Sequence, residues 1–303
     1  MENNAKLLSA TDPIAEKARR RKKRKESKAR HVAITVTCYL VLTLVAVFLV
    51  FPFFLMVMRS FMNINDIYNV RIIPTQWTFD NYIKLFTENN YLLYFWNTLK
   101  IVLFNIIAVP LSASLCAFSF ARLRWKGKKI VFGCVLATLM IPGTVTQVPL
   151  YVMFSKLGWL NTMLPLTIPA LFGGGAINIF LLRQFMRGLP KEIDEAAKID
   201  GANTFQIYFR IIMPLCKPIL LYVAVGAFAS SWTDFYSPLI YLNESSSYTL
   251  AVAIYQDALQ NSNLNTANLK MAAGVFMSIV PAVVFFLYQR KLIDGLTLGA
   301  VKG

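Results

Sequence analysis

Long uncharged apolar runs that recur along the chain constrain its fold more than any other feature. A helix needs about 20 residues to cross a hydrocarbon core of about 30 Å. Backbone polar groups inside lipid must bond to one another, so the spans are expected to be helices. We therefore expect an all-α polytopic membrane protein with six transmembrane helices. The runs are Val32–Met58, Ile101–Ala121, Ile130–Ser155, Leu157–Leu182, Pro218–Thr233 (which reaches full length only by continuing past Asp234 to Leu242) and Met271–Gln289.

The net charge of +16 is concentrated before the first run, in a dense basic block over residues 17–30. Such a block is typical of a nucleic-acid-binding tail or of a segment that lies against anionic lipid. Its position next to a membrane-length run favours the second interpretation. We expect residues 1–30 to form a basic cytoplasmic tail that holds the N-terminus inside.

Basic side chains recur after the second, fourth and sixth runs, whereas the alternate loops at 60–93, 155–163 and 243–270 hold few. Because basic residues accumulate in cytoplasmic loops, this pattern places both termini in the cytoplasm. The chain then divides into the tail at 1–30, a six-helix transmembrane domain at 31–288 and a cytoplasmic C-terminal tail at 289–303. The basic residues of these loops are Arg122, Arg124, Lys126, Lys128, Lys129, Arg183, Arg187, Lys191, Lys198, Arg290 and Lys291.

Catalytic and nucleotide-binding groups are missing from the sequence. The four cysteines have neither metal nor redox spacing, and His31 is the only histidine. No G-x-x-x-x-G-K-[ST] run is present, so the chain has no P-loop for ATP. We predict no catalytic residue, no metal site and no bound cofactor, and energy for any work must come from a gradient or a partner.

Two of the expected spans are interrupted. "MIPGTVTQVP" places Pro142, Gly143 and Gln147 inside the third, and "LPLTIPALFGGG" interrupts the fourth. Broken helices are tolerated where protein or a water-filled cavity covers the freed backbone. The breaks indicate either a translocation path with movable segments or ordinary kinks of membrane helices.

The fifth span contains "SSWTDFYSPL", with Trp232 and the carboxylate of Asp234. An ionisable residue inside a span is costly and commonly functional. A structural hydrogen-bonded role for Asp234 and a role in lining the path are equally consistent with its place near the outer end. Trp232 and Asp234 join Pro142, Gly143 and Gln147 as candidate residues of the path.

A compact polar element, residues 190–214, lies between the fourth and fifth spans. Pro190 suits a helix start, and Gly201 stands where a left-handed cap ends that helix. Asn203 and Gln206 have the spacing of a capping box for a second helix, which Pro214 is expected to end. We expect a rigid helix–turn–helix on the cytoplasmic side, with an apolar stripe formed by Phe205, Tyr208, Phe209 and Ile212.

The first helix of this element has a face of small residues. Ile193, Ala196 and Ala197 share it, and Glu195 lies off it, where it can accept a charge-assisted hydrogen bond. Two alanines allow another backbone to come close. The element is therefore either a hairpin that packs under its own spans or, as its rigidity favours, a unit that docks into the cleft of a partner.

The motif Glu195-Ala196-Ala197, followed by Gly201, Ile211 and Pro214, resembles the EAA loop of ABC importer permeases, with Met213 in place of the usual leucine. The resemblance continues outside the loop. "YFWNTLKI", "IFLLRQFMRGLPKEIDEAAKIDGA", "SWTDFYSPLIYLN" and the final "DGLTLGAVKG" are similar to maltose-type carbohydrate permeases of the MalG type. The similarity covers nearly the whole chain from about residue 40 and implies the type I ABC importer permease fold.

The resemblance also implies partners and roles. A second, MalF-type permease would complete the path, two ATPase subunits that hold ATP-Mg would dock beneath, and an extracellular binding protein would deliver the sugar. Glu195, Ala196, Ala197 and Gly201 would fit a cleft of the ATPase, with Ile211 and Pro214 in the same loop. The C-terminal tail, with Gly299, Ala300 and Lys302, would contact the ATPases. The implied location is a bacterial inner or plasma membrane.

Three alternatives stay open at this point. The first is an ABC permease for another solute such as glycerol phosphate, although the basic residues Arg71, Lys84 and Lys156 of the outer loops are few. The second is a gradient-driven secondary transporter, which would need repeats and ion-coupling residues that are not evident. The third is an integral-membrane enzyme, for which catalytic groups are missing.

Overall fold

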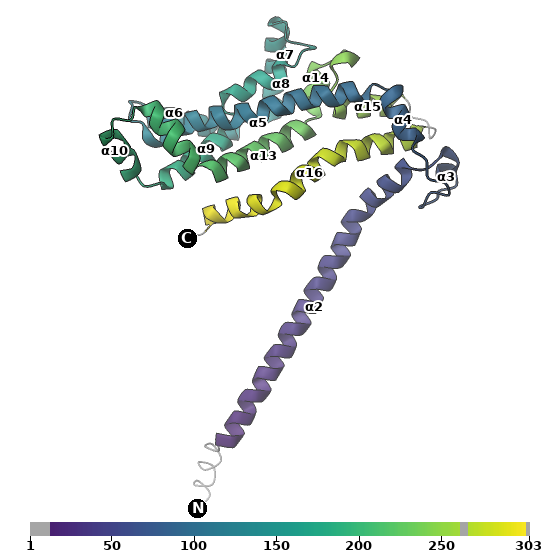
Figure 1. Ribbon diagram of the computed structural model, residues 1–303, viewed down its shortest axis with the longest axis horizontal. Coiled ribbons are helices and arrows are strands. Elements are labelled where there is room, and N and C mark those ends of the chain that lie inside the picture. The colour runs from purple at the N-terminus through teal and green to yellow at the C-terminus, as the bar shows by residue number, and fades with distance from the viewer. Residues whose placement is uncertain (1–12, 261–265, 301–303) are drawn as a thin grey trace, which may run out of the picture. The chain divides into compact units, whose positions relative to one another are not determined.

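The computed structural model describes residues 13–260 and 266–300, with side chains described over 31–260 and 266–289 (Figure 1). Every regular element within these ranges is a helix, so the all-α fold expected from the sequence is confirmed. The chain divides into two units, Met1–Met58 and Arg59–Gly303, which are described separately. The second unit contains the polar element at residues 190–214 and all the helices from α3 (Ile64–Tyr68) onward.

The first unit is the greater part of α2 (Pro13–Ser60). From Val32 to Phe54 its side chains are exposed, including those of Phe48 and Leu49. A helix that is apolar all round is stable only when lipid or another protein covers it. The first expected span is thus present, with the length and surface of a transmembrane helix.

The number of membrane-length helices agrees with the prediction of six spans. Four helices are long and apolar enough to cross a membrane by themselves. Two further pairs of helices meet the same requirement when each pair is taken together, although each pair is bent. If each bent pair is one span, the described residues contain six. The four are His31–Ser60, Tyr91–Arg122, Leu164–Gly188 and Ala267–Gln289, and the pairs are Lys128–Met140 with Gly143–Lys156 (bent by 102°) and Thr204–Leu215 with Lys217–Thr233 (bent by 79°).

Both predicted breaks are present. Between η1 (Thr138–Met140) and α7 (Gly143–Lys156), Ile141 is extended, because the ring of the following Pro142 disfavours helical backbone. The fourth span is divided by residues 173–175, three glycines with positive φ. A Cβ on Gly174 would lie 2.5 Å from Val109, so only glycine permits this approach to the neighbouring helix.

The fifth span ends earlier than predicted. Instead of continuing past Asp234 to Leu242, α13 (Lys217–Thr233) stops where Asp234 becomes extended. The carboxylate of Asp234 accepts the backbone N–H of Ser237 at 3.1 Å, and a new helix, α14 (Tyr236–Tyr241), begins there. An aspartate that bonds an amide three residues ahead favours a helix start over helix continuation.

Helix α5 (Tyr91–Arg122) is the centre of the second unit and packs most extensively against α13 and α9 (Ala176–Gly188) (Figure 1). One apolar cluster joins its C-terminal half to α9, α13 and residues 197–216. A second joins its N-terminal half to α4 (Asp80–Thr87), α15 (Leu250–Gln260) and α16 (Ala267–Ala300). The other helices are α3 (Ile64–Tyr68), α6 (Lys128–Ala137), α8 (Leu164–Thr167), η2 (Ile168–Phe172), α10 (Glu192–Ile199), α11 (Thr204–Gln206), η3 (Ile207–Ile212), α12 (Met213–Leu215) and η4 (Ser245–Ser247).

The loops poor in basic residues meet at one end of this unit. The N–H of Asn161 donates to the carbonyl of Tyr241 at 2.9 Å, and its side-chain oxygen accepts the N–H of Asn243 at 2.6 Å. The basic end of α5 lies with residues 189–194 instead, through contacts of Arg122. Loops that were assigned to one side of the membrane by their charge therefore associate with each other.

Candidate functional site

The polar element between the fourth and fifth spans folds as a helical hairpin, residues 190–216. Helix α10 (Glu192–Ile199) begins two residues after Pro190, not at it as predicted, and Gly201 ends the turn with φ +81°. Asn203 and Gln206 form the predicted capping box. The backbone N–H of Asn203 donates to Oε1 of Gln206 at 2.8 Å, and the backbone N–H of Gln206 donates to Oδ1 of Asn203 at 2.9 Å. The start of the second arm is thereby fixed by local hydrogen bonds.

The second arm differs from the prediction. After α11 the chain forms a π-helix, η3 (Ile207–Ile212), and Pro214 lies inside the following α12 instead of ending the element. The wider π turn shifts the side-chain phase, so Tyr208 and Ile212 are buried while Phe205 and Phe209 are exposed. The predicted apolar stripe is therefore wrong: its four residues divide between two faces.

The buried face holds the hairpin against α5. The Tyr208 hydroxyl lies 2.7 Å from the Ser114 hydroxyl in a hydrogen bond, and its ring packs on Phe118 at 5.2 Å between centroids. Ala197 is buried in the same cluster. The expectation that Ala196 and Ala197 share an outward face is thus corrected, because Ala197 packs inward and only Ala196 is exposed.

The opposite face of the hairpin is apolar and open. The exposed fractions are 87% for Ile199, 72% for Phe205 and 52% for Phe209. Glu195 and Gly201 are exposed as well, so large apolar side chains and the Glu195 carboxylate are both accessible on the hairpin. Large exposed apolar side chains gathered on a rigid element mark a surface for protein interaction. Of the other residues of the motif, Ile211 is half-buried and Pro214 is exposed.

Arg122, the last residue of α5, anchors the first arm. Its Nη1 lies 3.3 Å from Oδ2 of Asp194 in α10, and its Nη2 donates to the carbonyl of Leu189 at 3.0 Å. Sequence reasoning missed this contact, because Arg122 was counted only as a loop charge and Asp194 was given no role. The basic residue at the end of a span and the acid in the first turn of α10 were the available signals.

Two adjoining cavities, of about 300 Å³ and 710 Å³, lie between α5, the broken fourth span and α13. Asn105 lines both, and its amide donates to the Leu166 carbonyl and to the Ser231 hydroxyl. Sequence reasoning missed Asn105, although an asparagine in an apolar span is a signal of hydrogen bonds between helices. The cavities also share the lining residues Leu166, Pro169, Ser230 and Ser231.

The five candidate residues of the path are not brought together. Asp234 lines the smaller cavity in addition to its structural bond with Ser237. Trp232 is 1% exposed in the second apolar cluster, where its indole N–H donates to the Met277 carbonyl at 3.2 Å. Trp232 is therefore a packing residue in this structure. Pro142 and Gly143 lie exposed at the 102° bend, and Gln147 is half-buried in α7.

The C-terminal candidates lie at the limit of the description. Gly299 and Ala300 are in the last turn of α16, of which only the backbone is described. Lys302 lies outside the described residues altogether. Their contact with ATPase subunits stays a prediction.

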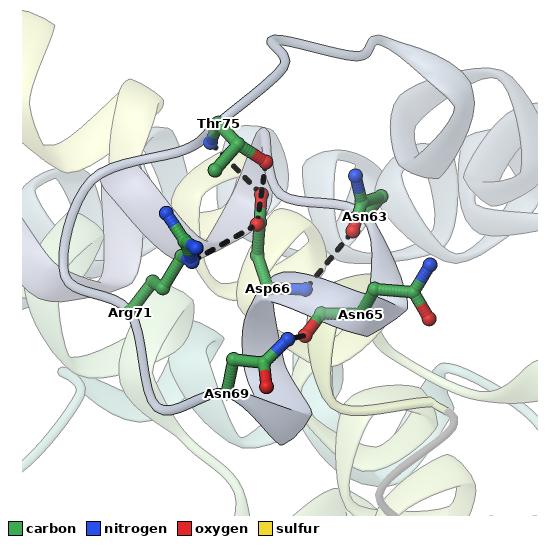
Figure 2. Close-up of polar contacts among 6 residues, drawn as sticks. All are labelled: Asn63, Asn65, Asp66, Asn69, Arg71 and Thr75. Atoms are coloured by element: carbon green, nitrogen blue, oxygen red, sulfur yellow. Dashed lines mark hydrogen bonds and ion pairs between the residues drawn. The ribbon is translucent and has the colours of Figure 1, made fainter.

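A second structured region, missed by sequence reasoning, is the Asp66 loop, residues 63–78 (Figure 2). The carboxylate of Asp66 accepts the hydroxyl of Thr75 at 2.6 Å and its N–H at 3.0 Å, and lies 3.9 Å from the Arg71 guanidinium. These bonds, chiefly that of the Thr75 hydroxyl, hold the pKa of Asp66 below its ordinary value of 3.8. Asn63 caps α3 through the Asp66 amide.

These features define a class: a polytopic helical membrane protein with polar-lined cavities and a rigid hairpin that presents an apolar face. Residues 111–297 match the family described as binding-protein-dependent transport system inner membrane component. The chain belongs to this family. It is thus a membrane component of a transport system and not an enzyme.

Relatives with similar sequences have names of the same kind. The galactooligosaccharides transport system permease protein GanQ of Bacillus subtilis is 34% identical, over 92% of this chain and 99% of that protein. The arabinooligosaccharides transport system permease protein AraQ of Halalkalibacterium halodurans is also 34% identical, over 86% and 93%. A crystal structure of a bacterial ABC transporter that imports the acidic polysaccharide alginate matches with a TM-score of 0.76 at 19% identity, over 85% of this chain and 95% of that one, and supports the fold.

Proposed function

We propose that this chain is one of two different permease subunits of an ATP-driven importer of oligosaccharides. The observation that carries the proposal is the exposed apolar face of the hairpin, with Ile199, Phe205 and Phe209 around a rigid turn. In a chain without a P-loop, such a face supplies the contact through which an ATPase acts. Relatives that are named for galacto- and arabinooligosaccharide transport support the choice of substrate.

The partners follow from this assignment. A second permease completes the path, two ATPase subunits hold ATP-Mg, and an extracellular binding protein delivers the sugar. The hairpin then faces the cytoplasm, as do both termini, and the Asp66 loop lies outside. Binding of ATP closes the ATPase pair, and the docked hairpin converts that closure into rigid-body motion of the spans.

In the docked state we assign the close fit to Ala196 and Gly201, which are exposed, and the polar anchor to Glu195. The residues of the larger cavity, chiefly Asn105, Ser230 and Ser231, line part of the path. Asp234 lines its outer part. Pro142, Gly143 and Gln147 lie at the bend of the third span, where movement during opening is expected.

The test is a reconstituted complex of this chain with the second permease, the ATPase and the binding protein. Glu195→Lys should place a cation against a basic group of the ATPase, a juxtaposition that costs several kcal/mol in a partly desolvated contact. We expect normal insertion, loss of bound ATPase and loss of uptake of radiolabelled galacto- and arabinooligosaccharides.

The matched control is Glu192→Lys, an exposed position on the same helix but outside the proposed contact. A reverse-charge change in the ATPase should partly restore the Glu195→Lys complex. Wild-type uptake by Glu195→Lys with the ATPase still bound would contradict the docking role, and uptake driven by an ion gradient without ATP would contradict the proposed energy source.

A further inference from the structure

The contact between Arg122 and Asp194 joins two charged side chains that are both largely buried. Their exposed fractions are 5% and 14%, and the guanidinium and carboxylate lie 3.3 Å apart. Burial of two charges costs free energy that the pair regains only with good geometry, and removal of one partner leaves the other uncompensated. The pair is a single contact, since Nε of Arg122 and Oδ1 of Asp194 have no hydrogen-bond partner, and it links the end of α5 to the first turn of α10.

The guanidinium makes a second bond that fixes its direction. Nη2 donates to the carbonyl of Leu189 at 3.0 Å, on the segment that leads from α9 into α10. Arg122 thus contacts the helix that carries Glu195 and also the chain that enters it. A lysine ammonium, as a single compact charge, would not span both acceptors in the same way.

Helix α5 also contacts the other arm of the hairpin. Ser114 is hydrogen-bonded to Tyr208 at 2.7 Å, and Phe118 packs against the same ring. Further along the same helix, Asn105 lines both cavities. One continuous helix therefore touches both arms of the hairpin and the wall of the cavities.

We propose that the Arg122–Asp194 ion pair is the positioning contact that makes α5 and the hairpin move as one body, so that motion of the hairpin reaches the cavity wall. This inference rests on the proposed function. A merely structural role would stabilise the hairpin without affecting how much substrate moves for each ATP consumed. The ratio of substrate transported to ATP hydrolysed distinguishes the two roles.

The first experiment measures that ratio in the reconstituted complex for Arg122→Met and Asp194→Asn. We expect the ATPase to stay bound and active, while the ratio falls about tenfold, within the usual range of allosteric coupling factors. Arg122→Lys should give an intermediate ratio, since it keeps the charge but not both bonds. The matched controls are Arg124→Met and Glu192→Gln, exposed neighbours that should leave the ratio unchanged.

The second experiment replaces the ion pair by a covalent bridge. Arg122→Cys with Asp194→Cys, in a background without Cys38, Cys116, Cys134 and Cys216, is joined by a short thiol cross-linker. Without cross-linker, the double-cysteine variant should have a low ratio of substrate transported to ATP hydrolysed. If the two helices move together, the bridge should raise that ratio toward the value of the cysteine-free protein that keeps Arg122 and Asp194. Transport blocked by the bridge would show relative motion and would overturn the inference.

The two hypotheses fail differently. A wild-type ratio in Arg122→Met and Asp194→Asn, or a ratio that falls only in proportion to ATPase lost from the membrane, would overturn the positioning role alone. A wild-type complex that transports sugar without hydrolysing ATP would instead contradict the proposed function.

Discussion

The hairpin and the Asp66 loop are both held by a buried or nearly buried aspartate, but the partners of the two carboxylates differ. Asp66 bonds to Thr75 and lies near Arg71, residues of its own loop. Asp194 pairs with Arg122 at the end of a distant helix. The bonds of the Asp66 carboxylate are therefore local to its loop, although α3 also contacts α16, whereas the position of the hairpin depends on α5. The comparison separates a region that holds a shape from a region that can transmit a movement.

The largest effect is expected from Gly201→Val in the hairpin. A left-handed backbone costs an L-residue about 1–2 kcal/mol, and a β-branched side chain resists it more. Since φ is +81° at Gly201, the turn should change and re-aim Phe205 and the second arm. We expect normal membrane insertion with no ATPase bound and no sugar uptake, measured by co-purification and by radiolabelled uptake.

Two variants sharpen this prediction. Gly188→Val adds the same side chain at a glycine where an added Cβ meets nothing within 4 Å and φ is not positive, so uptake should persist. Gly201→Asn should retain part of the activity, because asparagine tolerates the left-handed conformation. Equal activity of Gly201→Val and Gly188→Val would show that the turn geometry is not required.

The next effect is local to the Asp66 loop. Asp66→Ala removes the acceptor of two Thr75 bonds, so the loop should open. Arg71 is the only basic residue between 60 and 83 and gives a single trypsin site there. We expect severalfold faster cleavage after Arg71 in the purified protein. Asn65→Ala, at an exposed position of the same turn, should cleave at the wild-type rate.

The pH dependence of this loop follows from the lowered pKa of Asp66. A carboxylate with a folded-state pKa below 3.8 stabilises the loop above that pH, and this contribution is lost as the pH falls through the folded value. The fluorescence of Trp77, taken as wild type minus Trp77→Phe, should therefore change only below pH 3.8. A midpoint above 3.8, or an unchanged transition in Asp66→Asn, would contradict the assigned bonds.

Much of the fold follows from local rules that the sequence displays. Apolar runs predict the spans, the residue before Pro142 predicts the bend, and Gly201 with Asn203 and Gln206 predicts the hairpin turn. These features depend on residues close together in the chain. Backbone preferences at such positions need no tertiary information.

The missed features depend on residues that are distant in the chain or on a change of helix type. The π-helix at Ile207–Ile212 divides the predicted stripe of Phe205, Tyr208, Phe209 and Ile212 between two faces, because the prediction assumed an α-helical period. The pairing of Arg122 with Asp194 needs the packing of α10 against α5, which no periodicity reveals. Trp232 was misplaced for the same reason, since its burial depends on α16.

The smallest effect concerns one tyrosine hydroxyl in the hairpin and one beside the Asp66 loop. Tyr208 bonds to Ser114 at 2.7 Å in the hairpin, and Tyr82, which follows the Asp66 loop, bonds to Ser60 at 2.8 Å. Each Tyr→Phe change removes one hydrogen bond and should lower the free energy of unfolding by about 1 kcal/mol. Ser114 also donates to the Leu111 carbonyl at 2.9 Å, so Tyr208→Phe leaves its hydroxyl paired.

The two tyrosine variants should therefore match in stability and differ in function. Because Tyr208 joins the second arm of the hairpin to α5, Tyr208→Phe should lower the substrate transported per ATP, by less than Arg122→Met does. Tyr82→Phe should leave that ratio unchanged. The measurements are denaturant unfolding of the purified chain and the transport ratio of the reconstituted complex. An equal loss of the ratio in both variants would mean that it reports general stability, and that the hairpin has no special link to the cavities through α5.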